Sequence, residues 1–186
     1  MALHASPPPT SRFLFGAGLG MGLAMLGMVG RKLMVQAPTM LAGDWNRALE
    51  AEHEATLSLF DRLARTQDDA TARRALLLMQ LKHALGKHAI EEENAVYPAM
   101  RQHGMKEEAD ALNADHGYVK QYLYELSDLV GDNAAFQTKL AAFRADIEQH
   151  MRQEEDELFP RLKRALDEAA TSDLTRRMNQ EGLKLA

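Results

Sequence analysis

Histidine and glutamate recur along this 186-residue chain at a spacing that suits metal coordination. The pattern H-x3-E-x4-aromatic-Pro occurs twice, with every matched position 62 residues apart. The two copies run from His88 through Glu92 to Pro98, and from His150 through Glu154 to Pro160. One further histidine precedes each copy, His53 by 35 residues and His116 by 34. The sequence therefore predicts two helical hairpins that carry the same polar residues.

Helical geometry decides which of these residues face inward, because positions three or four apart share one face. The repeated histidines and glutamates fall on stripes that are otherwise apolar. Burying unpaired polar groups is costly, so these side chains must satisfy one another or share a cation. Imidazole together with carboxylate suits iron, manganese or zinc. The candidate metal ligands are His53, His88, Glu92, His116, His150 and Glu154.

Other acids and histidines near the repeat are predicted to lie off the inner stripe. An adjacent helix position is rotated by roughly 100°, which favours a solvated charged face for the neighbouring acids. These acids are Glu91, Glu93, Glu155, Asp156 and Glu157. His83 is expected to point outward, His103 to lie in a turn, and His4 to belong to an N-terminal lead.

The elements that position the ligands are four long amphipathic segments, predicted at 44–66, 70–102, 106–130 and 134–168. Short polar breaks separate them, and no stretch shows the alternation of a β-strand. The fold class is therefore all-α. Short connections between long helices make neighbours antiparallel, which predicts an up-down-up-down four-helix bundle.

The chain before the bundle has a different composition. Residues 1–12 form a Pro-containing lead, residues 13–30 are uncharged and rich in Gly and Met, and residues 31–43 form a linker. Eighteen uncharged residues reach the lower limit for a membrane helix, and their glycines would allow close helix contact and homo-oligomers. A surface-lying segment is the alternative, while Arg31 and Lys32 argue against a cleaved signal peptide.

If residues 13–30 form a membrane helix, the positive charges on either side of it favour, only slightly, an inner-membrane protein whose bundle, residues 44–168, is cytoplasmic. Without a membrane helix the chain is expected to be cytoplasmic. Residues 169–186 are predicted to be a C-terminal tail, either a short capped helix or frayed. The net charge of −5 disfavours nucleic-acid binding, and the absence of cysteine excludes thiolate ligands, disulfides and a cysteine nucleophile.

The arrangement of His53, His88-x3-Glu92, His116 and His150-x3-Glu154 resembles the hemerythrin-type HHE cation-binding domain over roughly residues 44–168. The resemblance implies a four-helix bundle that holds two non-haem irons with a bridging oxo or hydroxo group. It also implies that Glu92 and Glu154 bridge the irons and that the four histidines are terminal ligands.

One feature departs from the oxygen-carrying members of that family, which have two histidines four residues apart on the third helix. Here Leu112 precedes His116 by four residues and Lys120 follows it by four. The missing histidine disfavours simple oxygen carriage.

The favoured function is a non-enzymatic one, in which the chain senses or handles iron, dioxygen, nitric oxide or peroxide. One alternative is a redox enzyme that reduces peroxide or nitric oxide, or a protein that donates iron for iron–sulfur repair. Another is a membrane-tethered scaffold in which the metal is structural.

Overall fold

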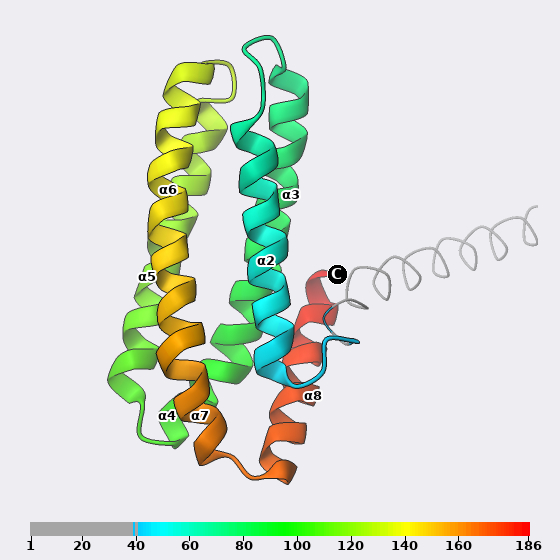
Figure 1. Ribbon diagram of the computed structural model, residues 1–186, viewed down its shortest axis with the longest axis vertical. Helices are drawn as coiled ribbons and strands as arrows, with labels where there is room; N and C mark the ends of the chain where they lie inside the picture. The colour runs from blue at the N-terminus through cyan, green and yellow to red at the C-terminus, as the bar shows by residue number, and fades with distance from the viewer. Residues whose placement is uncertain (1–38, 40) are drawn as a thin grey trace, which may run out of the picture.

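The computed structural model describes residue 39 and residues 41–186, and within them all regular structure is helical (Figure 1). This confirms the all-α class. The long helices are α2 (Trp45–Ala64), α3 (Thr71–Glu91), α5 (Lys106–Asp128) and α6 (Asn133–Gln153). Three further helices are α4 (Tyr97–Gln102), α7 (Phe159–Ala165) and α8 (Glu168–Leu185).

The four long helices pack as a bundle. Helix α2 contacts α3 and α6, and α5 contacts the same two helices, so that the four close into a ring. The connections alternate between the two ends of the bundle, as the path of the chain in Figure 1 shows. The helix at residues 70–102 and the one at 134–168 were each predicted as single units, and each is observed as a run of helical segments.

Two π-helical turns interrupt these runs, η1 (Glu92–Val96) and η2 (Glu154–Leu158). In each, a backbone N–H donates five residues back, from Tyr97 to the Glu92 carbonyl and from Phe159 to the Glu154 carbonyl. The following residue is proline in both copies. Proline has no N–H for the α-helical bond and its ring crowds the preceding turn, so a widened turn lets the helix continue. The repeat therefore starts a π turn at each glutamate.

The core is divided by the polar residues of the repeat. One apolar cluster contains Trp45, Leu49, Leu112 and Phe159, and it lies toward the α4–α7 end of the bundle. The other contains Phe60, Leu81, Leu126 and Phe143 toward the opposite end. Along α2 and α5, and along the runs from α3 into η1 and from α6 into η2, the ligand histidine falls between residues of the two clusters. Each cluster therefore seals the polar layer from one side.

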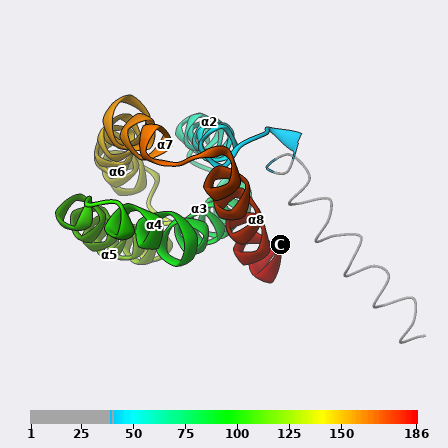
Figure 2. The ribbon, with the colours of Figure 1, turned by 90° about the horizontal axis from the view of Figure 1, so that it is seen from below.

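Helix α8 packs outside the ring, beside α2, α3 and η1 (Figure 2). Its Asp167 N-cap accepts a hydrogen bond from the Ala170 N–H, the usual way to satisfy a free donor at a helix start. Leu174 and Met178 pack in the same cluster as Trp45, and the backbone N–H of Trp45 donates to Thr175 Oγ1 at 3.0 Å. The segment predicted as a tail thus forms an 18-residue helix that extends the core.

The apolar segment 13–30, the lead 1–12 and most of the linker 31–43 lie outside the described residues. Among the helices that the structure does describe, none is long and apolar enough to cross a membrane.

Candidate metal centre

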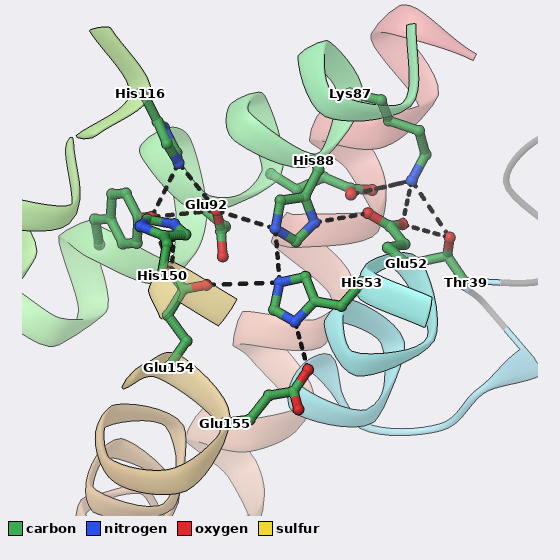
Figure 3. A network of polar contacts seen from close by, with 12 residues as sticks. Thr39, Glu52, His53, Lys87, His88, Glu92, His116, His150, Glu154 and Glu155 are labelled. Atoms are coloured by element: carbon green, nitrogen blue, oxygen red, sulfur yellow. Dashed lines mark hydrogen bonds and ion pairs between the residues drawn. The ribbon is translucent and has the colours of Figure 1, made fainter. Parts of the chain in front are cut away.

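The six predicted ligands converge in the polar layer, with each of the four chain segments of the ring contributing at least one of them (Figure 3). His53 comes from α2, His116 from α5, and each remaining histidine lies one helical turn before a glutamate at the start of a π turn. All six are buried, and both glutamates are fully so. The imidazole Nε2 atoms face the two carboxylates. The shortest distance from each Nε2 to a carboxylate oxygen is 3.2–3.5 Å.

The opposite nitrogen of every one of these histidines faces a second carboxylate. His53 Nδ1 lies 2.6 Å from Glu155 Oε1, and His116 Nδ1 lies 2.8 Å from Glu93 Oε1. His88 and His150 make the corresponding contacts with Glu52 at 3.1 Å and Asp115 at 3.4 Å. A carboxylate that accepts from Nδ1–H fixes the ring and leaves the Nε2 lone pair free to bind a metal.

The contact between His53 and His88 tests whether a cation fits. Their Nε2 atoms lie 3.0 Å apart, while each Nδ1 faces its own carboxylate. If both rings are neutral and donate through Nδ1, two nitrogen lone pairs point at each other. A proton or a metal ion must lie between such atoms, because two acceptors repel. The donor set here therefore fits a cation.

Unsatisfied polar atoms in the same layer support this fit. Glu92 Oε1, Glu154 Oε2 and His150 Nε2 are buried without a hydrogen-bond partner. Such atoms are rare in folded proteins and require an explanation. Donor atoms of His53, His88, Glu92 and Glu154 lie within 4.8 Å of one another, and so do those of Glu92, His116 and His150. Two groups that share Glu92 can each hold an ion.

The pKa shifts of the carboxylate pair also indicate that the layer favours added positive charge, either as a proton or as a metal ion. Burial acts to raise the pKa of Glu92, but the His88 and His116 imidazoles hold it well below its ordinary value. Burial and the adjacent Glu92 carboxylate instead raise the pKa of Glu154 well above its usual range. Burial opposes protonation of His88, yet Glu92 and Glu52 raise its pKa strongly. Two close carboxylates cannot both ionise without nearby positive charge.

Tyr97 belongs to the site, although it was not predicted to be a site residue. Its hydroxyl lies 3.1 Å from both Glu92 Oε2 and Glu154 Oε1, and 3.2 Å from His116 Nε2. Burial and the two carboxylates raise its pKa well above 10, which keeps it a protonated donor. Tyr97 follows Glu92 by five residues, and the π turn between them brings it to the same face.

The prediction that the neighbouring acids face solvent is wrong for Glu91, and it holds only in part for Glu93 and Glu155, whose side chains are 27% and 37% exposed. Glu93 and Glu155 support histidines of the neighbouring helices, and Glu91 is fully buried. A position 100° from the inner stripe of a bundle helix faces the adjacent helix as much as it faces water. Asp156 and Glu157 are exposed as predicted.

Glu91 belongs to an ion-pair cluster behind His88. The Lys87 ammonium is 2.9 Å from Glu91 Oε1 and also contacts Glu52, whose second oxygen faces His88. Thr39 donates to Glu52 at 2.6 Å. Burial and the Glu52 carboxylate raise the pKa of Glu91 to about 8. Glu52, His88 and Glu91 also have the spacing of a metal-binding group, and Lys87 supplies a cation there.

The remaining histidines of the described chain lie away from the site. His83 is exposed and His103 lies in a turn, both as predicted, and His103 Nδ1 contacts the Ala99 carbonyl at 2.8 Å. His4 lies outside the described residues.

Comparison with known families agrees with this geometry, since residues 46–162 match the family described as the hemerythrin HHE cation binding domain. The chain belongs to the hemerythrin HHE family. The match includes all six converging residues and ends before α8. Neither a curated protein nor a solved structure gives a significant match to the chain.

This HHE domain differs from a five-histidine centre on the α5 side. Leu112, at the position of the missing histidine, is buried in the apolar cluster that contains Trp45. Inside the bundle, His116 Nε2 lies 3.2 Å from the Tyr97 hydroxyl and 3.4 Å from Glu92 Oε2. The matching residue of the second copy is Phe159, which has no hydroxyl and packs against His53 with ring centroids 6.3 Å apart. The two halves of the domain are therefore chemically unequal.

Proposed function

We propose that the bundle is a hemerythrin-type up-down-up-down domain that holds two non-haem irons with an oxo or hydroxo bridge. The observation that carries this proposal is the paired shell of the histidines. Each Nε2 faces the buried glutamates while each Nδ1 faces a second carboxylate. This arrangement is typical of histidines that ligate a metal. In a purely structural core these carboxylates would have no comparable role.

The two ligand groups suggest how the ions would divide. His53 and His88 would bind one iron and His116 and His150 the other, with Glu92 common to both groups. Glu154 would be shared as well, since its two oxygens lie 3.5 Å from His53 Nε2 and 3.4 Å from His150 Nε2. Imidazole and carboxylate together suit iron, although the donor set alone also accommodates manganese or zinc. Iron bound in this way would supply one-electron chemistry toward dioxygen, nitric oxide or peroxide.

The protein's own residues would orient and shield that chemistry. Glu93 and Glu155 hold the rings of His116 and His53, and the apolar clusters on either side exclude water. The Tyr97 hydroxyl holds a proton between the two buried carboxylates. We infer that the chain senses or handles iron or one of these small oxidants.

A redox enzyme is the second candidate, and Tyr97 is the observation that favours it. Reduction of peroxide or nitric oxide consumes protons, and a buried hydroxyl beside the centre is placed to deliver one. Sustained consumption of either oxidant with an external reductant, reduced several-fold by Tyr97→Phe, would support the enzyme. A spectral response without turnover would support sensing or handling.

The test is to reduce iron-loaded protein anaerobically and record optical spectra after adding dioxygen, nitric oxide or peroxide separately. We expect at least one of them to change the iron spectrum of the wild type. The exposed-site variant Glu157→Gln should respond in the same way, since that side chain lies outside the layer. A metal-loaded protein whose spectrum is unchanged by all three would instead indicate a structural metal.

A further inference from the structure

The HHE domain has two surface pockets of similar size, one in each half of its internal repeat. The first is about 190 Å³ and includes Glu52, Ala55 and Lys87 in its lining. The second is about 210 Å³ and lies between α5 and α6, with Asp115, Tyr118 and Gln149 in its lining. The repeat relates these residues pairwise, because each pair has the same offset from its nearest repeated histidine.

The pairing holds in the contacts as well as in the sequence. Glu52 precedes His53 and faces His88 Nδ1, while Asp115 precedes His116 and faces His150 Nδ1. Each pocket therefore has a carboxylate at one side that is also the support of a repeated histidine.

The two pockets differ in their charged residues. In the first, the Lys87 ammonium contacts Glu52 and Glu91. In the second, Gln149 corresponds to Lys87 and Gln153 to Glu91. No lysine or arginine is among the residues that line it. The lining has two carboxylates instead, Asp115 and Asp146. The lining of the first pocket thus includes an alkylammonium group, whereas the lining of the second includes none.

The lining of the second pocket suits both parts of an alkylammonium ion, the methylene chain and the charged head. Val119, Phe143 and Ile147 provide apolar contact for a short methylene chain. The rim residue Tyr118 is 64% exposed, so its ring is available to a cation. The Tyr122 ring already has partners, because it stacks on Phe143 and the Lys139 ammonium lies 5.6 Å from its centroid.

We propose that the pocket between α5 and α6 binds a small primary alkylammonium ion, which occupies the place that the Lys87 side chain holds in the first half. The ammonium would pair with Asp115 and Asp146, and the alkyl chain would lie against the apolar wall. Because Asp115 also supports His150, the bound cation would be one carboxylate away from the candidate metal centre, as Lys87 is. This inference goes beyond the proposed metal function and does not depend on the identity of the metal.

The test uses n-butylammonium, which has the length of a lysine side chain, with the full-length protein. Binding is followed by NMR shifts of Tyr118 and Ile147 and by calorimetry, at matched ionic strength and known metal content. We expect saturable binding with shifts at both residues. The neutral analogue n-butanol and the anion butyrate should each bind with at most a tenth of the affinity of n-butylammonium.

Two variants and a matched control decide the location. Gln149→Lys places a tethered ammonium at the position equivalent to Lys87 and should weaken butylammonium binding at least tenfold. Asp146→Asn removes one carboxylate of the pocket and should weaken it several-fold. Asp128→Asn removes the same charge from an exposed position at the end of α5 and should leave binding unchanged.

Absence of saturable binding to folded wild-type protein would overturn the proposal. So would equal binding of n-butanol, or unchanged binding by Gln149→Lys. Failure of the metal proposal would appear separately, as a protein that binds butylammonium but holds no iron.

Discussion

The carboxylates behind the histidines provide a graded test of the metal centre. We expect Glu93→Gln and Glu155→Gln each to lower metal affinity, because each removes the charged acceptor of a ligand histidine. Their contacts are short, at 2.8 and 2.6 Å, and their side chains are 27% and 37% exposed. Asp115 should matter less, since its contact with His150 is 3.4 Å and its side chain is 49% exposed.

The magnitudes follow from that geometry. Loss of an outer carboxylate costs about 10- to 100-fold in metal affinity, or about 1.4–2.7 kcal/mol. Partial exposure weakens such contacts, so we expect about tenfold to thirtyfold for Glu93→Gln and Glu155→Gln. For Asp115→Asn we expect roughly threefold or less.

Anaerobic competition with a chromophoric iron(II) chelator measures these affinities directly. Glu157→Gln is the matched control, because Glu157 lies in the same π turn as Glu155 but is exposed. Circular dichroism checks that each variant keeps its helices. Wild-type affinity in both Glu93→Gln and Glu155→Gln would refute the reasoning, as would an equal loss in Glu157→Gln.

Three further substitutions test the surroundings of the centre in metal-free protein. Tyr97→Phe removes a hydrogen bond to buried carboxylates and should lower the free energy of unfolding by about 1.5–3 kcal/mol in a urea titration; an unchanged midpoint would contradict the assigned contacts. Lys87→Met leaves Glu52 and Glu91 without their shared cation and should lower the free energy of unfolding by about 3–5 kcal/mol. The control Lys82→Met, on the exposed side of α3, should lower it by under about 1 kcal/mol. Met178→Ala opens the contact between α8 and the core, so it should cost about 2–5 kcal/mol and red-shift Trp45 fluorescence; a wild-type emission maximum would show that α8 does not cover Trp45.

The sequence was sufficient to predict the helices and the six converging residues. The reason is that one periodicity governs both: a residue at i+4 from a buried histidine is itself buried. The predicted boundaries lie within three residues of those observed for α2, for α5, and for the runs from α3 through α4 and from α6 through α7. The repeat added independent weight, since the same polar residues occupy the same stripe twice.

The outer carboxylates could not be predicted in this way. Glu93 supports a histidine on α5 and Glu155 one on α2, and such pairings depend on which helices are neighbours. Tyr97 was missed because an ideal α-helix turns residue i+5 away from residue i. The signal was present in Pro98, which prevents the normal helical bond and accompanies the π turn.

Helix α8 was underestimated for a different reason. Only Leu174, Met178 and Gly182 are buried along its 18 residues, so its apolar stripe is too narrow to stand out from the sequence. Its Asp167 N-cap is a local signal of a helix start, but it does not say which surface the helix covers.

Iron content is the measurement that most directly tests the central claim, that two ions share Glu92 and Glu154. Protein loaded anaerobically with iron(II) and freed of excess should contain two irons per chain by elemental analysis. Glu92→Gln, which alters a ligand common to both groups, should lose iron from both and fall below one per chain, while Glu157→Gln should keep two. One iron per chain in the wild type, or two irons retained by Glu92→Gln, would contradict the shared two-ion centre.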